Sequence, residues 1–371
     1  MAYIVILARG IQSSRLGCYG AAWSLTPNID RLASQSMVFD HFLVENTDPL
    51  RWGQSLLNAP TIWLGQSPPE TKSGLFKLFP ALPNDSRKIH LEMESAWATL
   101  SKSAAKVLVV ELTDSLPPWS PGQDDLDAYF QSEETKQQTD AHFPQSNPTP
   151  DNDDAERTDE QALSPWLSAL PTEKDPSLLH LHILRESLLL THSAAIASMD
   201  RKLGIILEFL APRQTSDTHV IFTSDMGISL GEKKHIGHGG GPPWLDPIHV
   251  PLIWCHPERA AFSLRHSALL AGSDLDELLN SNPKSPSGLI ERSWNYPREK
   301  GQEKIITTGL GELKSIRTHN WGLVLNKSGQ SNLFEFPMDH WEINDLSNQN
   351  RSVSAHLVQK LIEKTNADSL G

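Results

Sequence analysis

Continuous apolar runs of strand length recur along the chain and are separated by polar, glycine-containing stretches. The runs are Tyr3 to Leu7, Met37 to Phe39, Lys106 to Leu112, His219 to Thr223 and Val250 to Trp254. An apolar run without a helical period is typical of a strand that is buried on both faces of a parallel sheet. The pattern therefore predicts a largely parallel sheet that contains four of these segments, and a second short strand at Met37 to Phe39.

Helical patterns alternate with the strand-like runs. From Leu178 to Phe209, apolar residues recur at helical spacing, which predicts one long amphipathic helix. Thr26 is placed to cap another helix, with Pro27 at its first position. His356 to Lys364 is expected to form a closing helix. This alternation predicts the α/β class, with a three-layer α/β/α sandwich.

The last third of the chain has a different pattern. Four short runs there have the length and residue types of antiparallel strands, and they are Lys304 to Thr308, Leu313 to Thr318, Trp321 to Asn326 and Asn332 to Phe336. We therefore expect an α/β domain over residues 1–260. We expect a C-terminal subdomain over residues 261–371, with a small antiparallel sheet and the closing helix.

The stretch from Asp124 to about Ser164 is rich in Asp, Glu, Gln, Ser and Pro and has no apolar period. Such a composition does not bury enough apolar surface to offset the entropy of ordering the chain. We expect a solvated, flexible excursion that contributes little to the core. An acidic interaction segment is the functional alternative.

Charge and cysteine content narrow the function classes. The 371 residues carry a formal net charge of -13 and 38% hydrophobic residues, which suits a large core and argues against nucleic-acid or anionic-membrane partners. Cys18 and Cys255 are the two cysteines, so neither a disulfide framework nor a zinc motif is indicated. The oligomeric state stays open.

No apolar run reaches the length of a membrane span, and Met1 precedes the first strand by only a residue or two. The expected localisation is therefore cytoplasmic, with no membrane association.

One acidic residue stands where a ligand site is expected. Asp225 follows the run His219 to Thr223, at the carboxyl end of a predicted strand. Ligands of open α/β sheets bind outside the carboxyl ends of their strands. The glycine-rich Gly237 to Gly241 follows, and it allows backbone to approach a ligand closely. A strand, a turn and a loop without chemistry is the alternative.

Several motifs of this chain resemble those of the sulfatase family, in the alkaline-phosphatase superfamily. Leu16 to Gly20 (LGCYG) and Thr26 to Ala33 (TPNIDRLA) are almost identical to the corresponding motifs of the family. The family's T-S-D-H-G and V-P-L-I motifs correspond to Thr223 to Gly227 and to Val250 to Ile253, and its L-Y-D-L-x-x-D-P-x-E-x-N-N-L motif to Leu333 to Leu346. Enzymes of the family are often exported, so a signal peptide that has been removed stays an alternative to a cytoplasmic location.

The resemblance implies a nucleophile position at Thr47. The family's C/S-x-P-S-R motif stands here as Thr47 to Arg51, with Pro49 and Arg51 kept and Leu50 in place of serine. Without Cys or Ser at this position, the formylglycine of sulfatases cannot be made. Phosphate-cleaving relatives use Thr, so Thr47 and Arg51 remain candidate catalytic residues. A Thr that caps the helix through Leu56 and Leu57 is the alternative.

The resemblance also implies that the metal ligands are replaced. The family's first aspartates correspond to Ala8, Arg9 and Gly10, and its D-H/N pair corresponds to Asp225 and Met226. A hard cation needs several oxygen ligands, and Arg9 brings a positive charge into that space. We therefore expect vestigial metal-site positions, no bound metal, and an ion pair between Arg9 and Asp225 that is either direct or bridged by water.

Further positions differ from the family's pattern. Lys233 stands at the His of G-E-H, His238 at the Lys of G-K, and Leu116 at the His of D-P-H. Lys233 and His238 are the candidate anion-binding residues. The resemblance further implies a helix over Ser267 to Leu279, and a surface position, not a ligand role, for Asp200.

Two functional hypotheses follow. In the first, the chain keeps the sulfatase fold without metal-dependent sulfate-ester hydrolysis and serves as a binding or regulatory protein without a cofactor. In the second, it is an active sulfuric or phosphoric ester hydrolase with Thr47 as nucleophile, either metal-poor or metal-free, with calcium or another divalent cation as its cofactor if it needs one. The ligand that the resemblance implies is a sulfated or phosphorylated small molecule or a glycan.

Overall fold

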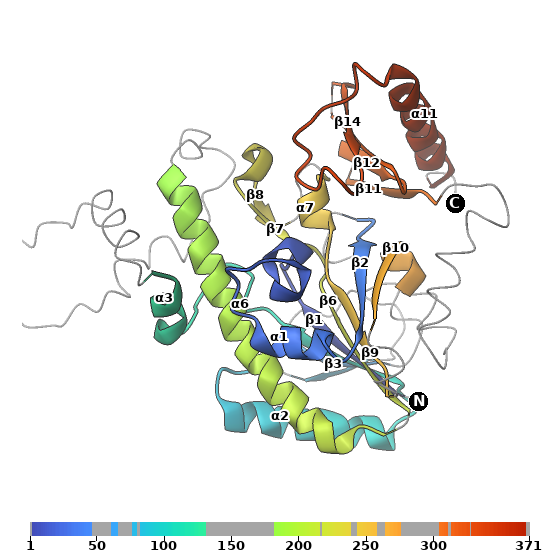
Figure 1. Ribbon diagram of the computed structural model, residues 1–371. Coiled ribbons are helices and arrows are strands. Elements are labelled where there is room, and N and C mark those ends of the chain that lie inside the picture. The colour runs from blue at the N-terminus through green and yellow to red at the C-terminus, as the bar shows by residue number, and fades with distance from the viewer. Residues whose placement is uncertain are drawn as a thin grey trace, which may run out of the picture.

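The computed structural model describes residues 2–46, 61–65, 76–79, 82–130, 182–215, 217–238, 243–257, 264–275, 304–310, 313–326 and 328–368 (Figure 1). Within these ranges one sheet of eight strands has the order β10-β2-β9-β6-β1-β5-β3-β4. The strands are β1 (Ala2–Ala8), β2 (Met37–Leu43), β3 (Thr61–Leu64), β4 (Phe76–Phe79), β5 (Val107–Leu112), β6 (Thr218–Thr223), β9 (Leu252–Cys255) and β10 (Arg265–Ala271).

The sheet is mostly parallel, as the sequence predicts. Of the eight strands, β9 alone runs antiparallel to its neighbours β2 and β6. The strand that precedes Asp225, β6, pairs with β1 in parallel, with Leu7 opposite Thr223. Both therefore end at the same edge of the sheet.

The central strand β1 is buried on both faces, which explains why its sequence is apolar without alternation. Ile4, Ile6 and Ala8 belong to one hydrophobic cluster, and Tyr3, Val5 and Leu7 belong to another. The first cluster includes side chains of three helices, α1 (Pro27–Ala33), α2 (Ser86–Lys102) and α6 (His182–Leu210), which lie together across the sheet in Figure 1. The long helix predicted from Leu178 to Phe209 is thus confirmed as α6.

The start of α1 is held by a residue that sequence reasoning placed at the surface. Pro27 begins the helix as predicted, but the side chain of Thr26 makes no capping hydrogen bond. The backbone N–H groups of Asn28 and Ile29 donate instead to the carboxylate of Asp200, at 3.0 and 2.8 Å. Asp200 is buried, so the predicted surface position is wrong. Its carboxylate satisfies helix N–H groups that lack partners within α1.

The first residues of the predicted acidic excursion are ordered. Residues 123–130 form helix α3 (Gln123–Phe130), which packs on α6. Asp125 is buried and forms an ion pair with Arg201 of α6, and Leu126 is buried beside it. The prediction of a flexible segment is wrong for Asp124 to Phe130, because the apolar Leu126 and the paired carboxylate of Asp125 anchor this helix. The remainder, from residue 131 to Ser164, lies outside the described residues.

The helix that the family resemblance implied over Ser267 to Leu279 is wrong for its first residues. Residues 265–271 form β10, which pairs in parallel with β2. Ala268 and Leu270 pack in one hydrophobic cluster, whereas Leu269 and Ala271 pack in another. This alternation is the period of a strand buried on both faces. The strand lies beyond the predicted domain boundary at residue 260 and is an edge strand of the large sheet.

The C-terminal part forms a separate small sheet, as predicted. It consists of β11 (Ile306–Leu310), β12 (Leu313–Arg317), β13 (Trp321–Leu325) and β14 (Ser331–Glu335), paired antiparallel in that order. Helix α11 (Arg351–Asp368) covers this sheet, with Leu357 and Leu361 buried against Ile316, Leu323 and Leu333. Two shorter elements lie between the sheets, and they are the hairpin β7 (Ile228–Leu230) with β8 (Ile236–His238) and helix α7 (Leu245–Ile248).

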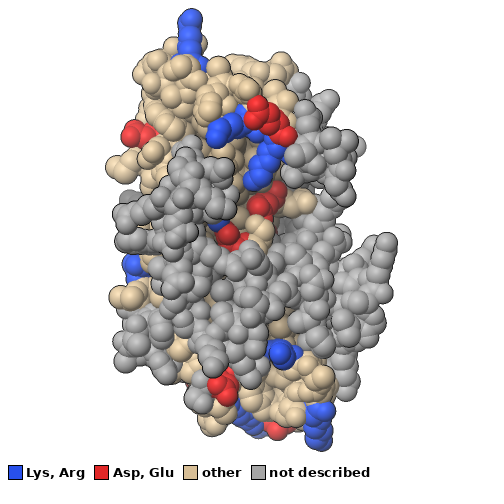
Figure 2. Space-filling view, turned by 90° about the vertical axis from the view of Figure 1, so that its right-hand side faces the viewer, with Lys and Arg blue, Asp and Glu red and all other residues tan. Residues whose placement is uncertain are grey.

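Figure 2 shows one face of the molecule, where Lys and Arg side chains lie beside Asp and Glu side chains among the described residues. No continuous basic patch is visible among those described side chains. Within the described ranges, no helix combines the length and the apolar content that crossing a bilayer requires.

Candidate functional site

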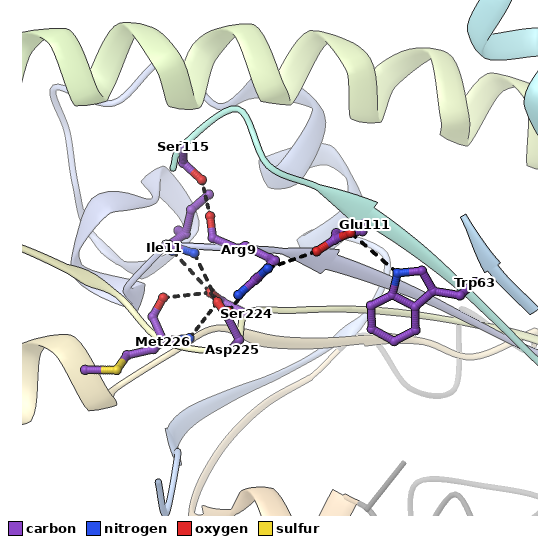
Figure 3. A network of polar contacts seen from close by, with 9 residues as sticks. Arg9, Ile11, Trp63, Glu111, Ser115, Ser224, Asp225 and Met226 are labelled. Carbon is purple, nitrogen blue, oxygen red and sulfur yellow. Dashed lines mark hydrogen bonds and ion pairs between the residues drawn. The ribbon is translucent and has the colours of Figure 1, made fainter. Parts of the chain in front are cut away.

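The carboxyl ends of β1, β5 and β6 bring three charged residues together. Leu7 lies opposite Glu111 on β5 and opposite Thr223 on β6. Side chains alternate between the faces of a strand, so Arg9 and Asp225, each two residues beyond these positions, point to the same face as Glu111. Figure 3 shows the three side chains converging at this edge of the sheet.

The guanidinium of Arg9 bridges two carboxylates. Its Nε donates to Asp225 Oδ2 at 2.7 Å, and its Nη1 donates to Glu111 Oε1 at 3.1 Å. The Nε1 of Trp63, on β3, lies 3.4 Å from Glu111 Oε2. Arg9 is 8% exposed, Glu111 2% and Asp225 1%. The ion pair that the sequence predicts between Arg9 and Asp225 is confirmed.

The second oxygen of Asp225 is occupied by the backbone. Oδ1 accepts from the N–H of Gly10 at 3.1 Å and from the N–H of Met226 at 2.8 Å. The hydroxyl of Ser224 lies 3.5 Å from the same oxygen and accepts from the N–H of Ile11 at 3.1 Å. The carboxylate of Asp225 is therefore surrounded by donors that favour its charged form.

Two residues fix the backbone beneath the guanidinium. Gly10 has a φ of +84°, and a Cβ there would lie 2.9 Å from Leu116 Cδ2. Only glycine fits that conformation and that space without strain. The hydroxyl of Ser115, buried after β5, donates to the carbonyl of Arg9, and the Nε1 of Trp119 donates to the carbonyl of Ser115 at 2.8 Å.

The electrostatics hold Arg9 in its charged state. Burial lowers the pKa of its guanidinium, but the attraction of Asp225 and Glu111, together with their hydrogen bonds, outweighs burial and raises the pKa overall. A fixed positive charge thus occupies the space between the carboxylates.

These residues do not fit a divalent cation. A hard cation requires several oxygen ligands with free lone pairs. Here Asp225 and Glu111 each face the guanidinium of Arg9, and Asp225 also faces two backbone N–H groups. The neighbouring Met226 is buried and offers only a thioether, a soft and weak ligand. Within the described residues, no group of three or more His, Cys, Asp or Glu side chains is arranged to hold a metal ion.

The candidate anion-binding residues lie elsewhere. Lys233 has a φ of 52°, and its Nζ donates to the carbonyl of Glu342 in the C-terminal part and lies 5.0 Å from the ring centre of Trp244. His238 ends β8, and its side chain lies outside the described structure. Thr47 and Arg51, the candidate catalytic residues, also lie outside the described residues. The structure therefore brings Arg9, Gly10, Asp225 and Met226 together, and it places Lys233 at a second location.

Sequence reasoning missed Glu111. The residue stands inside the apolar run Lys106 to Leu112, and a carboxylate buried in such a run requires a charged or hydrogen-bonding partner. That signal was sufficient to mark the position as unusual. The partners Arg9 and Trp63 come from distant segments, so the sequence alone does not identify them.

With this geometry established, the central segment can be compared with known families. The model of the sulfatase family matches residues 118–268, which contain β6, Asp225 and β9. This central segment of the chain is similar to the sulfatase family. No curated protein sequence matches it.

Solved structures share this fold over nearly the whole chain. One was determined in complex with its substrate D-glucosamine-2-N,6-O-disulfate, and it has 16% identity and a TM-score of 0.67, covering 98% of this chain and 97% of that one. The phosphonate monoester hydrolase of Agrobacterium radiobacter has 16% identity and a TM-score of 0.60, covering 98% and 95%. Ps i-CgsB in complex with k-i-k-neocarrahexaose has 13% identity and a TM-score of 0.62, covering 98% and 92%. At these identities the likeness establishes the fold of this chain.

Proposed function

We propose that this protein uses the sulfatase fold to bind a ligand, without metal-dependent hydrolysis of sulfate esters at the Arg9–Asp225 centre. The observation that carries the proposal is the guanidinium of Arg9 between Asp225 and Glu111. In a metal-dependent hydrolase, a cation polarises the ester oxygens and lowers the pKa of the nucleophile. A guanidinium cannot bind ester oxygens as a Lewis acid, and here its donors are directed at carboxylates.

The ligand class that we propose is a sulfated or phosphorylated small molecule or a glycan. Support comes from two solved structures with the same fold, one in complex with a disulfated glucosamine and the other with a neocarrahexaose. Under this proposal the protein has a binding or regulatory role.

The test combines metal binding with ester hydrolysis. Purified wild-type protein and the Asp225→Asn variant are titrated with calcium, magnesium, manganese and zinc by calorimetry. Both are then assayed on aryl sulfate and aryl phosphate esters with and without each ion. We expect no stoichiometric metal binding that depends on Asp225, and no turnover above that of the variant. Metal-dependent turnover that Asp225→Asn abolishes would refute the proposal.

The same assay addresses the hydrolase that uses Thr47. Turnover without added metal, lost in Thr47→Val and kept in Asp225→Asn, would favour that alternative. Thr47→Val keeps the branched shape of the side chain and removes only the hydroxyl, so it is a matched change at the nucleophile position.

A further inference from the structure

A pocket of about 290 Å³ lies between the segment that follows β7 and the turn that follows β14. Its walls include Lys233, Trp244 and Asp246 from the large domain, and His340, Trp341 and Glu342 from the C-terminal part. Neither Arg9 nor Asp225 nor Glu111 lines it. The pocket is thus separate from the guanidinium centre, and it lies at a junction between two parts of the chain, where ligand sites are common.

Two indole rings give the pocket an aromatic character. Trp341 is 47% exposed, and its ring centre lies 4.9 Å from that of His340 in an edge-to-face arrangement. Trp244 forms part of the other wall, and its Nε1 is buried without a hydrogen-bond partner among the described residues. A large exposed indole at the mouth of a pocket provides apolar contact area at a low cost in side-chain entropy.

The charges around the pocket balance. Lys233 lines it together with three carboxylates, those of Glu232, Asp246 and Glu342. Glu232 is paired with Arg15 at 2.9 Å, and Glu342 is paired with Arg317 at 2.5 Å. Three positive and three negative groups therefore give no net charge. An anionic substituent inside the pocket gains no net electrostatic attraction from this arrangement.

Polar groups remain directed at the pocket despite this balance. Among the described residues, the hydrogen-bond donors to Asp246 are neutral, Ser14 Oγ at 2.5 Å and Gln12 Nε2 at 3.2 Å, and a carboxylate has acceptor capacity for further donors. Burial lowers the pKa of His340, although Asp246 and Asp339 act in the opposite direction. The imidazole is therefore neutral near pH 7, with one nitrogen that donates and one that accepts.

The two walls are fastened to each other by Glu342. Its Oε2 accepts from the N–H of Leu245 at 2.8 Å, and its carbonyl accepts from Lys233 Nζ. Lys233 and Glu342 both have a positive φ, 52° and 51°, which non-glycine residues seldom adopt. Backbone strain on both sides of one pocket persists only where the surroundings enforce it, and such strain clusters at ligand sites. The pocket is therefore formed before any ligand enters.

We propose that this pocket holds one uncharged ring of a saccharide, with its C–H face packed on Trp341 and its hydroxyls bonded to Asp246, His340 and Lys233. This inference rests on the proposed function, because it specifies which unit of the proposed glycan ligand occupies this pocket. Aromatic walls suit the apolar face of a sugar ring, and converging donors and acceptors suit its hydroxyls. The balanced charge selects an uncharged unit over a sulfated one.

The test is a calorimetric titration of the full chain with glucose, galactose and N-acetylglucosamine, each compared with its 6-O-sulfated counterpart. We expect at least one neutral sugar to bind, and its sulfated counterpart to bind about tenfold more weakly. Trp341→Ala should weaken the binding of the neutral sugar by about tenfold or more, and Trp341→Phe should restore most of it.

The matched control is Trp23→Ala. Trp23 is 49% exposed, close to the value for Trp341, and it does not line this pocket, so its loss should leave sugar binding unchanged. The inference is overturned if no neutral sugar binds at millimolar concentration, if the sulfated counterparts bind equally well, or if Trp23→Ala weakens binding as much as Trp341→Ala.

These outcomes separate the inference from the proposed function. Sugar binding that depends on Trp341, found together with metal-dependent ester hydrolysis, would refute the proposed function and keep the pocket assignment. Absence of both sugar binding and hydrolysis would overturn the pocket assignment alone.

Discussion

Arg9 and Arg317 are both buried and paired with carboxylates, and their environments shift the pKa of their guanidiniums in opposite directions. Arg9, at the edge of the large sheet, contacts both Asp225 and Glu111. Arg317, at the junction with the C-terminal sheet, has Glu342 as its one ion-pair partner among the described residues, at 2.5 Å. Burial lowers the pKa of both guanidiniums, but the net pKa is raised for Arg9 and lowered for Arg317. Two carboxylates outweigh the loss of hydration, and one does not.

The partner of Arg317 shows the same imbalance. Burial raises the pKa of Glu342, and the charges of Arg317 and Lys233, with the hydrogen bond from Leu245, only partly oppose it. A buried single ion pair of this kind is weak evidence for stability. The Arg9 cluster thus stabilises its own charges, whereas the Arg317 pair mainly holds Glu342 in position in the wall of the pocket.

The largest expected effect is the loss of Arg9. Arg9→Met should lower the free energy of unfolding by roughly 3 to 5 kcal/mol, because two buried carboxylates lose their counter-charge together. Urea denaturation followed by circular dichroism measures it. In the double variant Arg9→Met with Asp225→Asn, Glu111 still lacks a cation, so most of the loss should persist. A loss below about 1 kcal/mol, as is typical of exposed pairs, would contradict this account.

The loss of Arg317 should cost less and should be recoverable. Arg317→Met should lower the free energy of unfolding by about 3 kcal/mol, because one carboxylate is left without its partner. Adding Glu342→Gln removes that charge and keeps an oxygen for the N–H of Leu245. The double variant should therefore regain much of the stability in the same denaturation experiment. If the double variant is as unstable as Arg317→Met alone, the stability lost with Arg317 does not come from the unpaired charge of Glu342.

A third buried group sharpens the comparison because no carboxylate pairs with it. His249 donates from Nε2 to the carbonyl of Asp40 at 2.7 Å, and its Nδ1 has no partner among the described residues. The ring centres of His41 and His340 lie 6.1 and 5.6 Å from that of His249. Burial, with smaller effects of His340 and His41, lowers the pKa of His249 from 6.5 to about 3.

The pH dependence of stability follows from this shift. Between pH 6.5 and about 3 the unfolded chain binds a proton at this position and the folded protein does not. The free energy of unfolding should therefore fall as the pH falls below 6.5, by at most about 1.4 kcal/mol per pH unit from His249. His249→Gln should reduce the slope of stability against pH by about that amount, as urea titrations between about pH 7 and about pH 5 would show. An unchanged slope would mean that His249 is not held neutral by burial.

Much of the large sheet was predictable because its strands are buried on both faces. Between their first and last residues, runs such as Tyr3 to Leu7 and His219 to Thr223 have no polar position that a helix would need on its exposed side. The Arg9 to Asp225 contact was also predictable, since both residues were expected to leave parallel strands at one edge. The prediction failed where the conformation of a segment depends on its tertiary contacts. The run that includes Leu269 has the composition of a helix as well as of a strand, and its pairing with β2 decides between them.

Buried carboxylates formed the second group of errors. Asp200 lies on a helix, where the sequence offers no sign that the first turn of α1 covers it. Asp125 lies in an acidic stretch, and its partner Arg201 is distant in sequence. Glu111 stands in an apolar strand, and its partners are Arg9 and Trp63. In each case the hydrogen-bonding or ion-pair partner of the carboxylate is contributed by another segment, so periodicity and composition along the chain do not predict it.

The position of β1 at the centre of the sheet has a consequence for synthesis of the chain. Its neighbours are β5 and β6, so the apolar β1 stays without its second neighbour until Thr223 has left the ribosome. Contacts between such distant segments form slowly, and unpaired apolar strands are exposed to aggregation in the meantime. Until β6 has been synthesised, the nascent chain therefore needs protection of the exposed strand β1 from association with other chains.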